Sequence, residues 1–476
     1  MKNCFKKVGK KELTPEQEER LKNVETYAQH HGVPKTRREF LASGAILGAA
    51  SIALPSALTL IHQNALAQSC VATKMPGFVT VNLNGGASLA GNVLALDAGR
   101  NPLATYAPVG LGSTANAQAI ATKPFGVAGP NFVGISGFLA GLSGTTSQAT
   151  RDRVSMLLFC VASNDDSTQN EFDPTPLINR AKSGAGAFLP PLGNNRNMPA
   201  VLPEVPALNV GSLADIQNAI GVQGAIQSLT AAQKEKIFRS ISRMSESQSR
   251  ALASTSGGDL LSALVKDATG LNVELIGNTN SGTDPQTQAG LNNVWNFNNQ
   301  GQLRDASVVF NVLRGNSTAG YIEMGGYDYH GQGRANQDTR DTQAGQTVGR
   351  ILETASVMNE KICVLVTSDG SVGHDLSLQP GSAPTGDRGT HGMAYALFFD
   401  PVARPGQSDS QVGNFRSSGA DRIGVDEQSP IGGSPARAIA AVLANYLSFS
   451  GLAGAFESVA PRIFTTDELN QVIKIG

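Results

Sequence analysis

Two short apolar runs, YIEM at residues 321–324 and ICVLVT at residues 362–367, enclose a helix-like stretch at residues 341–359. Short runs rich in Val, Ile, Leu and Phe are typical of strands that are buried on both faces. Similar runs lie at residues 78–83, 154–161 and 394–399. Further helix-like segments lie at residues 303–313 and 435–447, the second with Ser434 as a candidate N-cap. Because strands and helices alternate, the sequence predicts an α/β fold with a mostly parallel sheet, which binds ligands at the carboxyl ends of its strands.

The middle of the chain departs from this alternation. Residues 212–264 carry helical signals and few strand signals, and residues 277–302 are rich in Asn, Gln, Gly and Ser. We therefore expect residues 185–300 to form a helical, loop-rich insertion or cap, which would shape specificity.

The N-terminal region has the parts of a twin-arginine export signal. TRREFL at residues 36–41 supplies the arginine pair, an apolar stretch follows at residues 41–61, and ALA at residues 65–67 is a small-residue cleavage site. A transmembrane helix is the alternative, but two glycines and Pro55 interrupt the apolar stretch. The sequence predicts a signal peptide with an extended n-region at residues 1–67 and a mature protein of residues 68–476. The Tat export machinery would carry it to the periplasm or the cell exterior, with no membrane span after cleavage.

Charge and cysteine content narrow the properties of the mature protein. The predicted leader holds ten of the 37 Lys and Arg residues and six of the 38 Asp and Glu residues, which leaves a net charge of −5. This balance argues against nucleic acid as a partner. Cys70, Cys160 and Cys363 remain, and their odd number leaves at least one thiol unpaired. Cys160 and Cys363 lie in apolar runs, so we expect buried thiols there; any disulfide pairing among the three stays open.

Histidine is scarce beyond the predicted cleavage site. His330, His374 and His391 are the three that remain of six, and all fall within one stretch of the chain. The first lies in GGYDYHG, residues 325–331, directly after the predicted strand at residues 321–324. Side chains alternate in extended backbone, so Asp328 and His330 would point to the same side. A carboxylate and an imidazole so placed can share one divalent metal.

Two other strand-end segments offer metal ligands. Asp369 follows the strand at residues 362–367, and His391 lies in a loop, GTHG at residues 389–392, before the strand at residues 394–399. The alternative is that the aspartates cap turns and that the histidines bond to backbone groups. The scarcity of histidine favours a shared site. His374, in a long Gly/Ser/Pro loop, is a secondary candidate for a lid residue or a solvated side chain.

The segment NLNGGAS, residues 82–88, ends the first predicted strand. Its glycine pair would let backbone approach a ligand closely or turn sharply, and Ser88 is a candidate nucleophile. A plain turn from strand to loop is the alternative. The chain has no GxSxG, HExxH, P-loop or GxGxxG motif, so the standard serine hydrolase, zinc protease and nucleotide-binding families lack their signatures.

The order of these motifs resembles Tat-exported bacterial proteins of unknown function that are related to the alkaline phosphatase and sulfatase superfamily. The motifs are LNGGA at residues 83–87, GYDYH at 326–330, VTSDG at 366–370 and GTHG at 389–392. The resemblance implies a doubly wound α/β fold and, in catalytic members, two divalent metals that flank an oxygen nucleophile attacking phosphorus or sulfur. It matches Asp328, His330 and His391 to one metal site and Asp369 to an acidic ligand of the other. The ion implied is divalent: zinc, calcium, magnesium or manganese.

At several positions this chain lacks residues that are typical of the proteins it resembles. Active phosphatases have an aspartate at the end of the first strand, where this chain offers Asn84 or Ser88, and a histidine where this chain has Gly370. The relatives of unknown function usually show SEFGR where this chain reads SDGSV, at residues 368–372. The second metal site is therefore depleted. Ser88 is the first candidate for the nucleophile, with Ser113 and Thr114 behind it.

Two functions follow from the sequence. The first is an exported metal-dependent hydrolase that acts on phosphate or sulfate esters of a small molecule or a polymer. The second is a catalytically silent secreted binding or surface protein on the same fold. The missing ligands favour the second function, and the retained Asp-x-His pair favours a bound metal.

Overall fold

The computed structural model describes residues 74–103, 105–106, 112–113, 121–133, 136–163, 172–182, 187, 189–193, 207–219, 233, 236, 243, 282–329, 332, 334–368, 389–418 and 422–476. Apart from residue 243, these belong to one compact unit made of Thr73–Ser240 and Leu271–Gly476. The predicted leader, residues 1–67, lies outside the described residues, so its cleavage stays a prediction.

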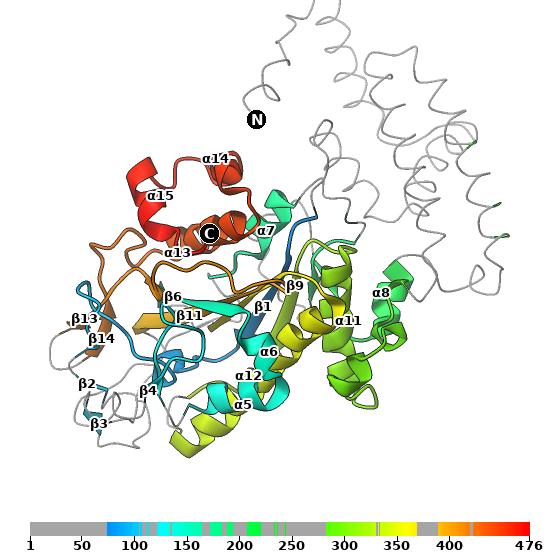
Figure 1. Ribbon diagram of the computed structural model, residues 1–476, viewed down its shortest axis with the longest axis horizontal. Helices are drawn as coiled ribbons and strands as arrows, with labels where there is room; N and C mark the ends of the chain where they lie inside the picture. The colour runs from blue at the N-terminus through cyan, green and yellow to red at the C-terminus, as the bar shows by residue number, and fades with distance from the viewer. Residues whose placement is uncertain are drawn as a thin grey trace, which may run out of the picture. The chain divides into compact units, whose positions relative to one another are not determined.

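An eight-stranded sheet forms the centre of this compact unit (Figure 1). Its strand order is β12-β6-β11-β10-β1-β9-β7-β8. Within this sheet β11 is antiparallel to both of its neighbours, and the other pairs are parallel. The strands are β1 (Gly77–Leu83), β6 (Val154–Ser163), β7 (Leu192–Gly193), β8 (Leu208–Asn209), β9 (Gly320–Met324), β10 (Ile362–Ser368), β11 (Gly389–Phe399) and β12 (Gln411–Val412). The predicted α/β fold with a mostly parallel sheet is confirmed.

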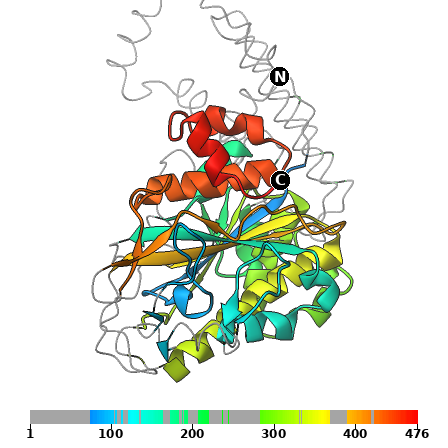
Figure 2. The same ribbon diagram turned by 60° about the vertical axis from the view of Figure 1, so that its left-hand side comes forward.

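Helices cover both faces of this sheet, as Figure 2 shows. One layer contains α5 (Gly137–Thr145), α6 (Gln148–Arg151), α11 (Gln300–Arg314) and α12 (Arg334–Met358). The other contains α7 (Thr175–Ala181), α13 (Pro435–Phe449), α14 (Phe456–Val459) and α15 (Thr466–Val472), and its orange and red helices lie above the sheet in Figure 2.

Strand β1 packs against both helical layers through alternate residues. The Phe78 ring meets the Tyr446 ring of α13 edge-on, with centroids 5.4 Å apart. Gly77 faces α11 instead, because a Cβ at that position would lie 3.1 Å from Leu313 Cδ2. All residues of β1 are buried. Burial on both faces explains why these strands are continuous apolar runs in the sequence.

The three long helices correspond to those expected at residues 303–313, 341–359 and 435–447. Ser434 caps α13 as predicted, since its Oγ accepts a hydrogen bond of 3.4 Å from the backbone N–H of Arg437. Asn299 caps α11 in the same way. Helix α12 begins at Arg334, well before the expected start at residue 341. The sequence placed the start too late because the first two turns of the helix are polar and give no apolar periodicity.

Smaller elements surround the sheet. Three two-stranded ribbons pair β2 with β3, β4 with β5, and β13 with β14. Their strands are β2 (Thr105–Tyr106), β3 (Gly112–Ser113), β4 (Ala121–Thr122), β5 (Phe132–Val133), β13 (Phe415–Ser418) and β14 (Arg422–Val425). The 3₁₀ turns are η1 (Leu89–Gly91), η4 (Pro285–Thr287), η5 (Leu291–Asn293) and η6 (Ala453–Ala455).

The predicted insertion or cap at residues 185–300 is described in part. Strands β7 and β8 lie in this range and extend the sheet beyond β9. Helix α8 (Leu213–Ala219) contacts α11. These pieces therefore belong to the same compact unit as the sheet.

The thiols of Cys160 and Cys363 are free and buried, as predicted. Burial raises the pKa of both thiols well above its ordinary value, so both are protonated and unreactive at neutral pH. Cys70 lies outside the described residues. None of the helices in the described part of the chain combines the length and apolarity that crossing a bilayer requires.

Helices α5 and α12 pack with their backbones in direct contact. A Cβ on Gly141 of α5 would lie 2.0 Å from the carbonyl oxygen of Thr342. Conversely, a Cβ on Gly345 of α12 would lie 2.0 Å from the carbonyl oxygen of Phe138. Both positions therefore exclude any side chain.

A second pair of glycines extends this contact. A Cβ on Gly137 would lie 2.3 Å from the carbonyl oxygen of Asp338, and one on Gly349 would lie 2.1 Å from Thr145 Oγ1. Residues four apart share a helix face, so each helix presents a strip of two glycines to the other. The strips fix how deeply α5 docks onto α12.

Adding one methyl group tests this packing. We expect Gly141→Ala and Gly345→Ala each to lower the free energy of unfolding by about 3 kcal/mol, because the helices must move apart. Gly144→Ala, in the same helix α5, is the matched control: a Cβ there meets nothing within 4 Å. The control should gain up to about 1 kcal/mol from the better helix propensity of alanine. Urea denaturation measures all three, and equal stabilities of the Gly141 and Gly144 variants would contradict the packing described.

Candidate functional site

The carboxyl ends of β9, β1 and β10 lie side by side in the middle of the sheet, and the row of strand ends that they form is called the edge of the sheet below. Leu83, the last residue of β1, pairs with Met324 of β9 and with Ser368 of β10. Two loops that carry candidate residues leave the sheet from this edge, residues 84–88 after β1 and residues 325–329 after β9.

Backbone hydrogen bonds join these two loops. The N–H of Asn84 donates to the carbonyl oxygen of Met324 at 3.0 Å, and the N–H of Tyr327 donates to the carbonyl oxygen of Asn84 at 3.0 Å. Further along, the N–H of Tyr329 donates to Gly86 at 3.4 Å. The loops therefore run together, and Asp328 lies against the glycine pair that ends β1.

Gly85 makes this approach of Asp328 feasible. Its φ of +118° belongs to a backbone region that favours glycine, and a Cβ there would lie 2.7 Å from the backbone nitrogen of Asp328. The sequence predicted a glycine pair suited either to a ligand or to a sharp turn. In the structure the pair also admits a second loop of the same chain.

Ser368 ties the loop after β1 to the end of β10. Its Oγ donates to the carbonyl oxygen of Leu83 at 2.7 Å and accepts from the N–H of Ala87 at 2.8 Å. The next residue, Ser88, is only 4% exposed. Its hydroxyl has no hydrogen-bond partner among the residues that the structure describes. A buried hydroxyl without a partner carries a desolvation penalty, so Ser88 is a group to which a ligand would add a favourable contact.

Asn84 differs from Ser88 in this respect. Its side-chain Nδ2 donates to Glu323 Oε1 of β9 at 3.1 Å. Of the two residues that could stand where active phosphatases carry an aspartate, Ser88 is therefore the one whose functional group is not engaged by a described residue.

A buried polar network joins the loop after β9 to helix α12. Asp341 of α12 accepts hydrogen bonds from the hydroxyl of Tyr329 at 2.6 Å and from Asn92 Nδ2 at 2.8 Å. Asn92 Oδ1 in turn accepts from Ser136 Oγ, the N-cap of α5, at 2.7 Å. Burial and the adjacent Asp341 carboxylate raise the pKa of Tyr329 well above its usual range, so its hydroxyl stays a donor.

Tyr327 adds a second anchor to α12. Its hydroxyl donates to the carbonyl oxygen of Arg340 at 2.9 Å, and its ring lies 6.1 Å from that of Tyr329. The two tyrosines flank Asp328, so the residue between them is fixed on both sides. Nothing in the sequence marked the network: the tyrosines flank the Asp-x-His pair, but Asn92 and Asp341 carry no motif.

His391 lies within β11 rather than in the loop predicted before it. The strand begins at Gly389, and an extra residue interrupts its pairing with β6 between Gly389 and Gly392. Because β11 is antiparallel to β10, the start of β11 lies at the edge where β10 ends. The glycines suggested a loop, but a β-bulge accommodates them within the strand.

The other candidate residues lie outside the described residues: His330, Asp369, His374 and Thr114. For His391 and Ser113 the structure describes the backbone but not the side chain. Among the residues it does describe, no three His, Cys, Asp or Glu side chains are grouped as a metal site would require. The structure thus brings together the loops of Ser88 and Asp328, and the shared metal site stays a prediction.

A buried carboxyl that no sequence motif marks, that of Asp173, lies just before α7. Asp173 Oδ1 accepts from the N–H of Thr175 at 2.9 Å, and the Thr175 hydroxyl lies 3.3 Å from that of Thr80 on β1. Burial raises the pKa of Asp173 to about 6. Its sequence context, an aspartate before Pro174, is that of an ordinary helix start, so no signal pointed to it.

Comparisons of the chain with protein-family models, with curated proteins and with solved structures gave no match.

A substitution at Gly85 tests the junction of the two loops. Gly85→Ala should lower the free energy of unfolding by about 3 kcal/mol, because the methyl group adds overlap with Asp328 to the strain of positive φ. Gly315→Ala is the matched control, since Gly315 has φ +80° and a Cβ there meets nothing within 4 Å. The control substitution should lower the free energy of unfolding by about 1 kcal/mol. Equal costs in chemical denaturation would show that the close approach to Asp328 does not constrain the fold.

Proposed function

We propose that this protein is an exported, metal-dependent hydrolase-like protein that acts on phosphate or sulfate esters. The observation that carries the proposal is the junction at the edge of the sheet, where the loops of Ser88 and Asp328 are joined by backbone hydrogen bonds. Ligands of parallel α/β sheets bind at this edge. The motif order supports the finer assignment, a doubly wound alkaline phosphatase-like scaffold with an insertion at residues 185–300.

In this proposal Asp328, His330 and His391 hold one divalent ion, and Asp369 is an acidic ligand of a depleted second position. The donor set of one carboxylate and two imidazoles suits zinc or manganese, and calcium and magnesium remain alternatives. A bound ion would lower the pKa of a nearby hydroxyl and neutralise the oxyanion of the ester.

Residues of the chain hold the proposed nucleophile and the proposed metal ligand in position. Ser88 is the proposed nucleophile, because its hydroxyl is buried at the edge and engages no described partner. Ser368 holds the backbone before Ser88 through Ala87, and the two tyrosines hold Asp328. Ser368 lies at the end of β10 and the tyrosine hydroxyls bond to α12, and a strand and a long helix are more rigid supports than free loops.

One observation favours the alternative, a silent binding or surface protein. Active phosphatases carry an aspartate at the end of the first strand, where this chain has Asn84 or Ser88, and the Asn84 amide is engaged with Glu323. An amide cannot supply the charge that a second metal ion needs. A protein that retains one metal without turnover would then bind its ester ligand rather than cleave it.

The predicted leader places the reaction outside the cytoplasm, after passage through the Tat machinery. The proposed substrate is therefore a small-molecule or polymer ester of the periplasm or the cell exterior. The net charge of −5 disfavours nucleic acid as that polymer.

Metal analysis and an ester panel test the proposal together. The purified mature protein should contain a divalent ion and hydrolyse generic phosphate or sulfate monoesters. Asp328→Asn and His330→Ala should each lower metal content by about tenfold or more, and Ser88→Ala should lower turnover by about 100-fold while metal stays bound.

Asp467→Asn is the control, because Asp467 lies exposed on α15. It should match the wild type in metal content and rate. Bound metal without turnover on the whole panel would assign the silent binding protein. If the purified protein contains no metal and His330→Ala does not change its stability, the proposed shared metal site is wrong.

A further inference from the structure

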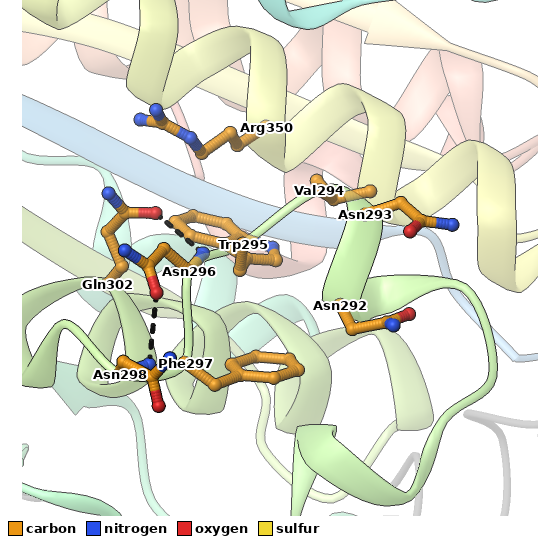
Figure 3. Close-up of a pocket in the computed structure, with 9 residues that line it drawn as sticks. All are labelled: Asn292, Asn293, Val294, Trp295, Asn296, Phe297, Asn298, Gln302 and Arg350. Atoms are coloured by element: carbon orange, nitrogen blue, oxygen red, sulfur yellow. Dashed lines mark hydrogen bonds between the residues drawn. The ribbon is translucent and has the colours of Figure 1, made fainter.

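A hollow of about 490 Å³ lies beside the N-terminus of α11 and is lined on one side by Arg350 of α12 (Figure 3). Its lining combines five carboxamide side chains from residues 292–302 with two aromatic rings and one guanidinium. The volume is in the range of small-molecule sites, which run from roughly 300 to 1,000 Å³.

Two of the carboxamides are oriented by hydrogen bonds within the lining. Gln302 Oε1 accepts from the backbone N–H of Asn296 at 2.9 Å, and Asn296 Oδ1 accepts from the N–H of Asn298 at 3.1 Å. Both oxygens are thereby engaged, so each side chain is left with its NH₂ group as a donor. Figure 3 shows these dashed bonds, with Gln302 and Asn296 grouped on the same side of Trp295 as Arg350.

Arg350 supplies a positive charge to the hollow. Its guanidinium lies 6.0 Å from the ring centroid of Trp295, and Trp295 is held in place by its own Nε1–H bond to Thr354 Oγ1 at 2.7 Å. Asp305 lies near enough to attract Arg350 but forms its ion pair with Arg304 at 2.9 Å. Among the described residues no carboxylate forms an ion pair with Arg350.

The start of α11 adds to the preference for negative charge. Asn299 caps the helix and Gln302 lies in its first turn. A helix of this length carries partial positive charge at its N-terminus and favours anions there. The NH₂ groups of Gln302 and Asn296 and the charge of Arg350 thus line one hollow, an arrangement suited to a group with several anionic oxygens.

The remaining lining suits the ring of a sugar. Phe297 is half-buried and offers part of its ring to the hollow, and exposed Asn292 and Asn293 offer both donors and acceptors. An apolar face flanked by carboxamides matches a pyranose, which has apolar C–H groups and hydroxyls around its rim.

We propose that this hollow is a binding site for acidic sugars, with the carboxylate or sulfate of the sugar on Arg350, Gln302 and Asn296 and the ring against Phe297. Arg350 lies nine residues beyond Asp341 on α12, about 14 Å along the helix, so the site is separate from the edge where the strands end. The inference does not depend on the proposed hydrolysis.

Trp295 is the sole tryptophan of the chain and lines the hollow, so its fluorescence reports on binding there. The full-length protein is titrated with galacturonate oligomers, with glucose 6-sulfate and with glucose. We expect a saturable change with at least one acidic sugar and none with glucose over the same range. The acidic sugar that saturates distinguishes a carboxylate from a sulfate ligand. Absence of saturation with both acidic sugars would overturn the proposal, as would equal binding of glucose.

Variants assign the signal to the hollow. Arg350→Gln and Gln302→Glu should each weaken binding by about tenfold or more, the first by removing the charge and the second by repelling the anion. Arg314→Gln is the matched control: this α11 arginine also lies over a ring, 5.8 Å from the centroid of Phe310, but does not line the hollow. Unchanged affinity in both test variants, with thermal unfolding like the wild type, would place the ligand elsewhere and overturn the proposal.

Discussion

The contact between α5 and α12 is the constraint on which the candidate site depends. Glycines on both helices let the two backbones touch, and this depth of docking sets the position of Ser136 at the start of α5 relative to Asp341 on α12. Asn92 bridges the two, and Asp341 then receives the hydroxyl of Tyr329. A helix pair held apart by side chains would separate these groups, and a separated pair would leave buried donors and acceptors unsatisfied.

This network also fixes the two loops at the carboxyl ends of the strands. Tyr329 and Tyr327 fix the loop after β9, and that loop is hydrogen-bonded to the loop after β1. Ser368 fixes the other side of the loop after β1, next to Ser88. A site built in this way has little freedom to adjust, which suits chemistry that depends on the placement of charge rather than on closure of the chain around a ligand. The hollow beside α11 uses the far part of α12 and shares none of these contacts.

The parts of the fold that the sequence predicted are those governed by local pattern. The runs at residues 78–83 and 362–367 are buried on both faces, and such runs are recognisable without their partners. The first turns of α12 were missed because they are polar, and the first residues of β11 because Gly389 and Gly392 resemble a loop. Long-range pairs could not be predicted: Asn92 and Asp341 are 249 positions apart, and nothing local links an asparagine to an aspartate at that distance. The same holds for Ser88, whose burial follows from the loops packed around it.

The central claim is that the edge formed by β9, β1 and β10 carries a divalent metal. Anomalous X-ray diffraction from crystals of the mature protein grown with manganese or zinc tests it most directly. We predict one strong anomalous peak with a carboxylate oxygen of Asp328 and imidazole nitrogens of His330 and His391 at about 2.0–2.3 Å. Imidazoles of His330 and His391 more than about 6 Å from any common point could not ligate one ion at such distances, and that result would contradict the claim.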